Sequence, residues 1–429
     1  MNFYFSIELL IFVVMVATFV VAAMAFKIPI GLSMAIAAIA GAAVGGYGFP
    51  LRHLVEGMFS YVDTILVIAT AMIFMKVVEK SGALDAITTS IVGRFHTKPA
   101  LLLILVMLVV MFPAMITGSS TASVLSAGSI MAPVLIMMGI PAVETACILS
   151  FGGILGMIAP PVNIPAMIIG GGVDIPYVGF EAPLSLLTFP LAITFVLYYG
   201  YKYAKNMDYE KVLPKLDHEI GKKYGFKLYL PIIVAIALMV INKVVTAIPD
   251  LGMPLVFIIA SITGLFTGKK INVFDTSKEA INSVLSVLSI LMGVGMFIQI
   301  MTLTGVRGYI VSVCLSMPQG WRYLAMAVSI PLFGAVSSFG ASSVLGVPFL
   351  LALMSKDTII TAAGISLISG LGDLMPPTAL AGIFAAQVVG LKDNYFPVLK
   401  KCLIPSLIII LWGLLIIIFS NKLAPIIGL

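Results

Sequence analysis

The sequence predicts an all-α polytopic membrane protein built from two inverted repeats, each with a re-entrant hairpin and a broken helix. Composition is the first reason: 61% of the 429 residues are hydrophobic and only 10% are charged, too few polar groups to coat a soluble domain of this length. The second reason is a repeat. A Gly/Ser/Thr cluster inside apolar sequence, followed by a Pro-Pro pair, occurs once in each half of the chain.

The first half divides into apolar stretches, several of them long enough to cross a hydrocarbon layer of roughly 30 Å. We expect, in order, membrane helices at 6–26, 29–48 and 61–80, an interfacial helix at 83–96, apolar arms at 99–116 and 122–138, a broken helix at 142–170 and a last helix at 183–203. No Lys or Arg precedes Lys27, so the first stretch is interpreted as a retained helix and not as a cleaved signal.

The two apolar arms predict a re-entrant hairpin. Gly118-Ser119-Ser120 breaks them apart, and each arm alone is too short to cross a bilayer comfortably. Irregular backbone at membrane depth is tolerated where protein buries it or where it lines a cavity. The tip of this hairpin is therefore expected near the membrane centre.

The second half repeats this order after a Lys-rich segment. Residues 1–203 and 228–429 are predicted as the two repeats, and 204–227 as a cytoplasmic linker between them. If the hairpin returns to its own side, each half crosses the membrane five times, so the second copy must be inverted. With the linker in the cytoplasm, eighteen Lys and Arg fall on that side and six on the other, which agrees with the positive-inside rule.

The breaks in the two hairpins are candidate ion and substrate sites. Helix ends at a hairpin tip present carbonyls to cations and N–H groups to anions. Gly118 and Gly340 are expected to permit the sharp backbone, and neighbouring hydroxyls add uncharged ligands: Ser119, Ser120, Thr121, Ser123, Ser342 and Ser343. The competing interpretation is that small and hydroxyl residues let membrane helices pack closely.

The Pro-Pro pairs are expected to break the helices that follow the hairpins. Pro160-Pro161 and Pro376-Pro377 each remove two N–H donors and free carbonyls one turn earlier. A bound cation between break and tip could satisfy those carbonyls, with help from Asn163 and Thr378 just beyond. A neighbouring helix or a simple kink could satisfy them equally well.

Asp373 is the one carboxylate expected near the membrane midplane, where an acid by default suggests ion coordination or proton transfer. Its repeat equivalent is Met157, so the two predicted ion sites are chemically unequal. In contrast, Lys76, Glu79 and Lys80 are expected to snorkel to water at a cytoplasmic helix end.

Other classes of function find little support in the sequence. The three His are dispersed, the three Cys lie within or beside apolar helices, and no phosphate-binding loop occurs. The net charge of +6 comes from Lys spread over short loops, which argues for membrane topology and against a nucleic-acid partner. The chain is expected to be neither an enzyme nor a cofactor-binding protein.

The motifs FPAMITGSSTASVLSAGSIMAPVLIMMGIP and ILGMIAPPVNIPAMIIGG resemble the large membrane subunit of tripartite ATP-independent periplasmic (TRAP) transporters, within the ion transporter superfamily. The resemblance covers nearly the whole chain. It implies an elevator-type secondary transporter of the bacterial inner membrane that imports a small organic anion, a dicarboxylate or related acid, with sodium as the coupling ion.

By this resemblance, each tip and its partner break would hold one sodium ion. The implied sodium ligands are Gly118, Ser119, Ser120, Ala159, Pro160 and Asn163 in the first half, and Gly340, Ser342, Asp373, Pro376 and Thr378 in the second. The substrate would lie between the tips, against Ser120, Thr121, Ser123, Ser343 and Val344.

The resemblance also implies partners: a small four-helix membrane subunit and an extracytoplasmic substrate-binding protein. One alternative is a stand-alone organic-anion symporter or antiporter of the same superfamily, coupled to sodium or, through Asp373, to protons. An alternative of another class is a membrane scaffold or receptor that keeps the fold without transporting.

Overall fold

A computed structural model of the chain describes residues 6–205, 218–244, 251–376, 378–391 and 394–429. Helices and turns make up this described part, and it holds no β-strand. Seven of its helices are long and apolar enough to cross a membrane, or eight if one pair bent by 43° counts as a single span. The prediction of an all-α polytopic membrane protein is confirmed.

The helices of the first half follow the predicted order. They are α1 (Ile7–Val20), α2 (Ile30–Val44), α3 (Leu51–Phe59), α4 (Val62–Ser81), α5 (Ala83–Phe95), α6 (Pro99–Thr117), α7 (Ser120–Ser123), α8 (Ser129–Met137), α9 (Ala142–Ile158), α10 (Ile164–Gly171) and α11 (Glu181–Ala204). The predicted arms are α6 and α7–α8, and the predicted broken helix is α9–α10. Only α3 was not predicted, because Arg52, His53 and Glu56 interrupt its apolar sequence.

The second half repeats this order with two differences. Its helices are α13 (His218–Tyr224), α14 (Leu230–Val244), α15 (Gly252–Gly264), α16 (Val273–Leu303), α17 (Val306–Ser316), α18 (Gln319–Gly334), α19 (Ser338–Ala341), α20 (Val347–Ala352), α21 (Thr358–Gly370), α22 (Leu380–Val388), α23 (Phe396–Ile418) and α24 (Ser420–Ile427). One unbroken helix, α16, takes the place of α3 and α4 together. The short helices at its two ends, α13 and α24, have no counterpart in the first half. Residues 206–217, half of the predicted linker, lie outside the described residues.

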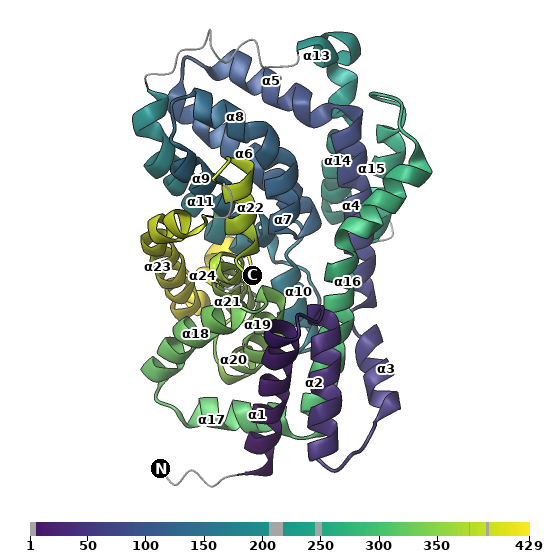
Figure 1. The fold of residues 1–429 in the computed structure, drawn as a ribbon, viewed down its shortest axis with the longest axis vertical. Helices are drawn as coiled ribbons and strands as arrows, with labels where there is room; N and C mark the ends of the chain where they lie inside the picture. Colours follow the sequence, from purple (N-terminus) through teal and green to yellow (C-terminus); the bar gives the residue numbers. More distant parts are fainter. Residues whose placement is uncertain (1–5, 206–217, 245–250, 377, 392–393) are drawn as a thin grey trace.

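The helices form two groups that lie side by side (Figure 1). The α16 bundle consists of α1–α4 and α14–α16, in which α16 packs against α2, α3 and α4. The α9 bundle consists of α6–α11 and α18–α23, in which α9 packs against α6, α11 and α22. Both hairpins and both broken helices belong to the α9 bundle.

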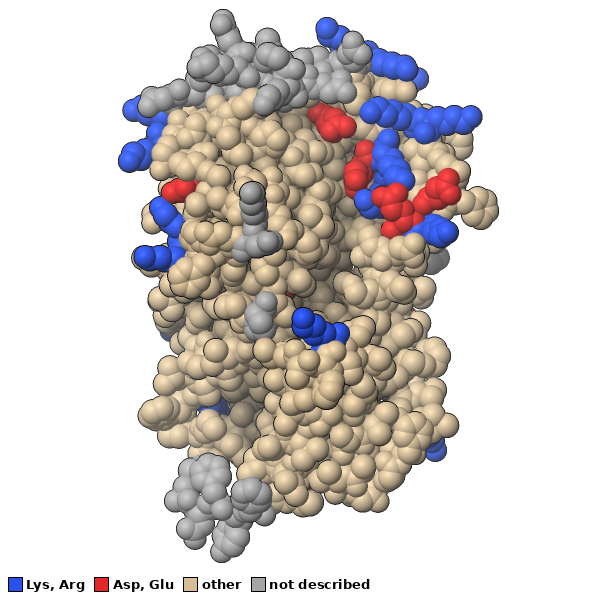
Figure 2. All heavy atoms as spheres, in the orientation of Figure 1, with Lys and Arg blue, Asp and Glu red and all other residues tan. Residues whose placement is uncertain are grey.

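Two helices lead from one bundle to the other at opposite ends of the molecule. Helix α5 crosses the upper end of the view, between α4 and α6, and α17 crosses the lower end, between α16 and α18 (Figure 1). Because these helices occupy equivalent places in the two halves, their positions agree with the predicted inversion. Most of the Lys and Arg visible on this face lie in its upper half (Figure 2).

Glycine allows α16 to pack closely against α2. A Cβ built on Gly293 of α16 would overlap the carbonyl oxygen of Gly31 in α2, and a Cβ on Gly31 would overlap that of Ser289. Small residues are what lets membrane helices approach to backbone contact, since lipid offers no hydrophobic force between them. The α16 bundle therefore depends on the absence of a side chain at Gly293.

We expect Gly293→Ala to lower the free energy of unfolding by about 1–3 kcal/mol, because the added methyl overpacks a backbone contact. The measurement is the thermal unfolding midpoint of the purified protein in detergent. Gly308→Ala in α17 is the matched control, since a Cβ there would meet nothing within 4 Å. Equal midpoints for the two variants would contradict the packing argument.

Candidate substrate and ion site

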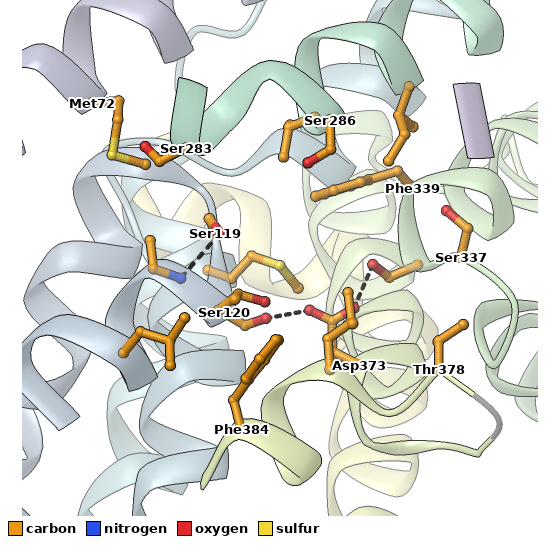
Figure 3. Close-up of a pocket in the computed structure, with 18 of the residues that line it drawn as sticks. Met72, Ser119, Ser120, Ser283, Ser286, Ser337, Phe339, Asp373, Thr378 and Phe384 are labelled. Carbon is orange, nitrogen blue, oxygen red and sulfur yellow. Dashed lines mark hydrogen bonds between the residues drawn. The ribbon is translucent and has the colours of Figure 1, made fainter. Parts of the chain in front are cut away.

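A cavity of about 410 Å³ lies between the two bundles. The α16 bundle lines it with one face each of two helices: Met72, Met75, Lys76 and Glu79 of α4, and Ser283, Ser286, Val287 and Ile290 of α16. Both sets follow the spacing i, i+3, i+4, i+7, which places side chains on one side of a helix. The α9 bundle lines the opposite wall with both hairpin tips, the second helix break and Met157 of α9 (Figure 3).

A serine begins the returning helix at each hairpin tip. The Ser119 side chain accepts a hydrogen bond from the Ala122 N–H (3.3 Å) and caps α7. The Ser337 side chain accepts one from the Gly340 N–H (3.0 Å) and caps α19. Serine is among the preferred N-cap residues because its oxygen satisfies an otherwise unpaired donor. The second tip therefore turns at Ser337.

The prediction that Gly340 shapes the second break is wrong. Gly340 lies inside α19 and is not among the glycines with positive φ. Gly118, in contrast, has φ 64° at the end of α6, as the first break requires. A Cβ on Gly118 would also lie 2.5 Å from the Ile164 side chain of α10. Both tips have an extended serine at the cap, and only the first places a glycine of positive φ before it.

Asp373 connects the two hairpins. It lies in the short helical turn Leu371–Leu374, at the break that follows α21. Its carboxylate accepts a hydrogen bond from the Ser120 hydroxyl of the first tip and another from the Ser338 hydroxyl of the second tip, the latter at 2.8 Å. Figure 3 draws both bonds. Two segments far apart in sequence thus share one carboxylate in the cavity wall.

The two halves also differ at the break as the sequence predicts. Met157, the repeat equivalent of Asp373, lines the same cavity. Each break is tied to its own hairpin: the Val162 N–H donates to the Met115 carbonyl (3.1 Å), and the Thr378 hydroxyl donates to the Ala335 carbonyl (2.8 Å). The two pairs of hairpin and break are thus joined in the same way, and only the second carries an acid.

The family model described as "Tripartite ATP-independent periplasmic transporter, DctM component" matches residues 13–423. The chain belongs to this family. It is thus the large permease component of a TRAP-type secondary transporter, a multi-pass membrane protein and not an enzyme. No curated protein sequence matches the chain.

The fold of this DctM-family chain is similar to that of the Alcanivorax borkumensis YdaH transporter, whose crystal structure has a topology described as unusual. The two share 15% sequence identity, and the match has a TM-score of 0.61 over 91% of this chain and 98% of that one. At this identity the likeness concerns the fold alone.

Of the residues predicted to bind ions or substrate, the structure of the DctM-family chain brings five into the cavity. These are Ser119, Ser120, Thr121, Asp373 and Thr378. Ala159, Pro160 and Asn163 are not among the residues that line it, and neither is Pro376; Pro377 lies outside the described residues.

Asn163 has a structural role in the first break. Its side-chain oxygen accepts from the Ala166 N–H (2.9 Å) and caps α10, and its amide donates to the Ile158 carbonyl and the Ser366 hydroxyl, both at 2.9 Å. The side-chain amide of Asn163 has two N–H donors, and these two hydrogen bonds use both of them. These bonds hold the ends of α9 and α10 together.

Four more predicted residues lie buried behind the tips and outside the cavity lining: Ser123, Ser342, Ser343 and Val344. The hydroxyl of Ser123 donates to the Val110 carbonyl, that of Ser342 bonds the Ser369 hydroxyl (2.7 Å), and that of Ser343 donates to the Gly340 carbonyl (3.0 Å). The prediction that Ser123, Ser343 and Val344 contact substrate is not supported by this arrangement, because the hydroxyls bond within the hairpins.

The expectation that Lys76 snorkels to water is also wrong, whereas the Glu79 side chain is 32% exposed. Both line the cavity, and the Lys76 side chain is only 18% exposed. Its ammonium forms ion pairs with Glu79 (3.1 Å) and with Glu279 of α16 (3.2 Å), and Lys80 pairs with Glu279 as well. Because α4 packs against α16, Lys76 and Glu79 near the end of α4 line the cavity.

Several cavity residues escaped the sequence analysis. They are Ser337 and Ser338 of the second tip, Ser283 and Ser286 of α16, and the aromatic residues Phe339 and Phe384. The sequence of the second tip is SSFGASS. Its glycine, Gly340, suggested a turn next to Ser342 and Ser343, whereas Ser337 caps the helix. Among the described residues, no group of three or more His, Cys, Asp or Glu could hold a metal ion.

We expect Ser338→Ala to lower the free energy of unfolding by about 1–3 kcal/mol, because it leaves the buried Asp373 carboxylate with one donor fewer. Thermal midpoints of purified variants measure the effect. Ser286→Ala, which also lines the cavity but makes no bond to Asp373, is the control. In the double variant Ser338→Ala/Asp373→Asn the two losses should not add; additive losses would mean that the bond contributes nothing.

Proposed function

We propose that the chain imports a small organic anion together with Na⁺ across the bacterial inner membrane, as the transporting subunit of a tripartite system, by an elevator movement of the α9 bundle. The α16 bundle would be the fixed scaffold. The observation that carries the proposal is the Asp373 carboxylate, held between two hairpin tips in a cavity that both bundles line.

The charge of Asp373 gives a physical reason for coupling. Its bonding partners at the tips are neutral hydroxyls, so the carboxylate has no cation beside it there. An organic anion entering the same cavity would meet a second negative charge at low dielectric, which costs free energy unless a cation enters too. Transport of the anion is thereby tied to binding of the cation.

Sodium suits the oxygen-rich breaks. Hard cations take hydroxyl, carbonyl and carboxylate ligands, and discontinuous helices in transporters commonly offer these to Na⁺. The second candidate is coupling to protons, favoured by the same absence of a cationic partner at Asp373: an intramembrane acid is a natural proton carrier. In that case the proton would replace the sodium ion at this half-site.

A contact between the bundles outside the cavity supports an elevator whose site is open to one side of the membrane at a time. The Tyr61 hydroxyl, between α3 and α4, donates to the Ile168 carbonyl of α10 (3.0 Å), joining the two bundles. Phe384 of α22 occupies the position equivalent to Ile168, four residues after the start of its helix. Phe384 instead lines the cavity, on the wall opposite α16 (Figure 3).

An exchange of these two arrangements would reverse the access. The contact at Tyr61 and Ile168 would open while Phe384 comes against α16. Lys76 and Glu79 line the cavity near the end of α4, on the side that the Lys distribution assigns to the cytoplasm. The arrangement described here is therefore proposed to be the inward-facing one.

Uptake by proteoliposomes tests the function. The chain, alone and with its small membrane subunit and binding protein, is assayed with a panel of radiolabelled carboxylates under an inward Na⁺ gradient or, separately, an inward H⁺ gradient. We expect accumulation driven by Na⁺ and abolished by Asp373→Asn. Asp357→Asn is the matched control, because Asp357 only caps α21 and Asn caps equally well.

Accumulation driven by H⁺ alone would assign the proton-coupled alternative. Accumulation by the isolated chain would exclude an obligate tripartite system. If no carboxylate were accumulated under either gradient with all three components present, the proposed function would be wrong.

We also expect Tyr61→Phe to shift the chain away from the inward-facing arrangement. Loss of one neutral hydrogen bond of about 1 kcal/mol changes the equilibrium about fivefold. The readout is the rate at which a cysteine placed at Ser286 reacts with an impermeant maleimide from the cytoplasmic side, which should fall. Tyr47→Phe, at a residue 49% exposed, is the control. An unchanged rate in Tyr61→Phe would contradict the assigned role of this contact.

A further inference from the structure

The charges in the cavity limit the kind of anion it can take. Of the side chains that line it, three are charged: Lys76, Glu79 and Asp373. Lys76 is thus the one cation among the described lining residues, and no arginine is present with it. A substrate with two carboxylates would find a single positively charged partner and would bury its second charge beside Asp373 and Glu79.

Lys76 is placed to bind one carboxylate. Its ammonium is held in the cavity wall by Glu79 and Glu279, and Lys80 also pairs with Glu279. The Glu79 side chain is 32% exposed, so water can solvate it when a substrate carboxylate takes its place on Lys76. Glu279 keeps Lys80 as a partner throughout. The exchange leaves no buried charge unpaired, which is the condition for it to be favourable.

The hydroxyls of the cavity are largely bound to the protein itself. Seven of them bond with the chain: those of Ser119 and Ser337 cap helices, those of Ser120 and Ser338 donate to Asp373, and those of Ser126, Ser283 and Thr378 donate to carbonyls. A polyhydroxylated substrate needs free donors and acceptors, and leaves buried polar groups unpaired without them. The cavity is therefore poorly equipped for a sugar acid.

The other residues that line the cavity include aromatic rings and flexible methionine side chains. Phe339 follows the second tip, Phe384 lies on α22, and Met72, Met75 and Met157 complete the surface (Figure 3). Aromatic rings and methionines bury apolar surface and adapt to irregular shapes. Such a wall stabilises a hydrocarbon body at about 25 cal/mol per Å² of apolar surface removed from water.

We propose that the cavity takes a monocarboxylate with an apolar body, whose carboxylate contacts Lys76 and whose hydrocarbon part packs against Phe339 and Phe384. This assignment rests on the proposed function and specifies its substrate class. It therefore replaces the dicarboxylates that the family resemblance implies with acids that carry a single carboxylate.

Binding of three acids of different chemistry tests the assignment. The purified full chain in Na⁺ buffer is titrated with 4-methylpentanoate, with succinate and with gluconate at constant ionic strength, and the rise in thermal midpoint gives each Kd. We expect 4-methylpentanoate to bind most tightly. Lys76→Gln should weaken it about tenfold, the scale of a lost hydrogen bond to a charged group, and Lys76→Arg should restore much of the affinity.

Matched variants separate contact from folding. Lys401→Gln removes a cation from a separate ion pair, with Glu144, outside the cavity lining, and should leave Kd unchanged. Phe339→Leu and Phe384→Leu should weaken binding several-fold, whereas Phe396→Leu, at a residue 70% exposed, should not. Unfolding midpoints without ligand identify any variant that is merely unstable.

Three results would overturn the assignment: tighter binding of succinate or gluconate, equal effects of Lys76→Gln and Lys401→Gln, or no binding of 4-methylpentanoate by a chain that accumulates another carboxylate in proteoliposomes. The last result would leave the proposed function intact. Failure to accumulate any carboxylate would instead reject the function itself.

Discussion

The Asp373 carboxylate is the point on which the rest of the site depends. A charged group at membrane depth is stable only where donors surround it, and here the donors are hydroxyls from two different hairpins. The bond network therefore requires both tips to come to the same place. That requirement explains why the tips are short capped helices, and why the breaks after α9 and α21 lie directly behind them.

The two bundles that line the cavity are built differently. The α16 bundle is packed through backbone contact at glycine, whereas the α9 bundle carries the irregular segments. The cavity lies at their boundary, so its lining is one regular wall of helix faces and one wall of helix ends. In a rigid movement of the α9 bundle, the first wall changes and the second travels with the substrate. Lys76 would then act only in one orientation, while Asp373 acts in both.

Much of this could be predicted from the sequence. Hydropathy and the Gly118 and Pro-Pro breaks predicted most helices of the first half, and Met157 and Asp373, paired by the repeat, both line the cavity. Residues at the second tip were harder to predict, because Gly340 resembles a turn residue but an extended serine can turn a chain as well. Lys76 was misjudged for another reason. Whether a charged helix end faces water or a cavity depends on which helix packs beside it, and α16 is two hundred residues away in sequence.

The contrast between α16 and the bent pair α3–α4 has a mechanical consequence. A continuous helix of 31 residues resists bending along its whole length, whereas the 43° joint between α3 and α4 concentrates compliance at one place. That joint lies beside Tyr61, where the two bundles touch. The second half therefore contributes a continuous, stiff helix, and the first half contributes a helix pair with a hinge. If the bundles were displaced relative to one another, the bending would occur mainly in the first half of the chain. Topological symmetry between the repeats therefore does not imply equal stiffness.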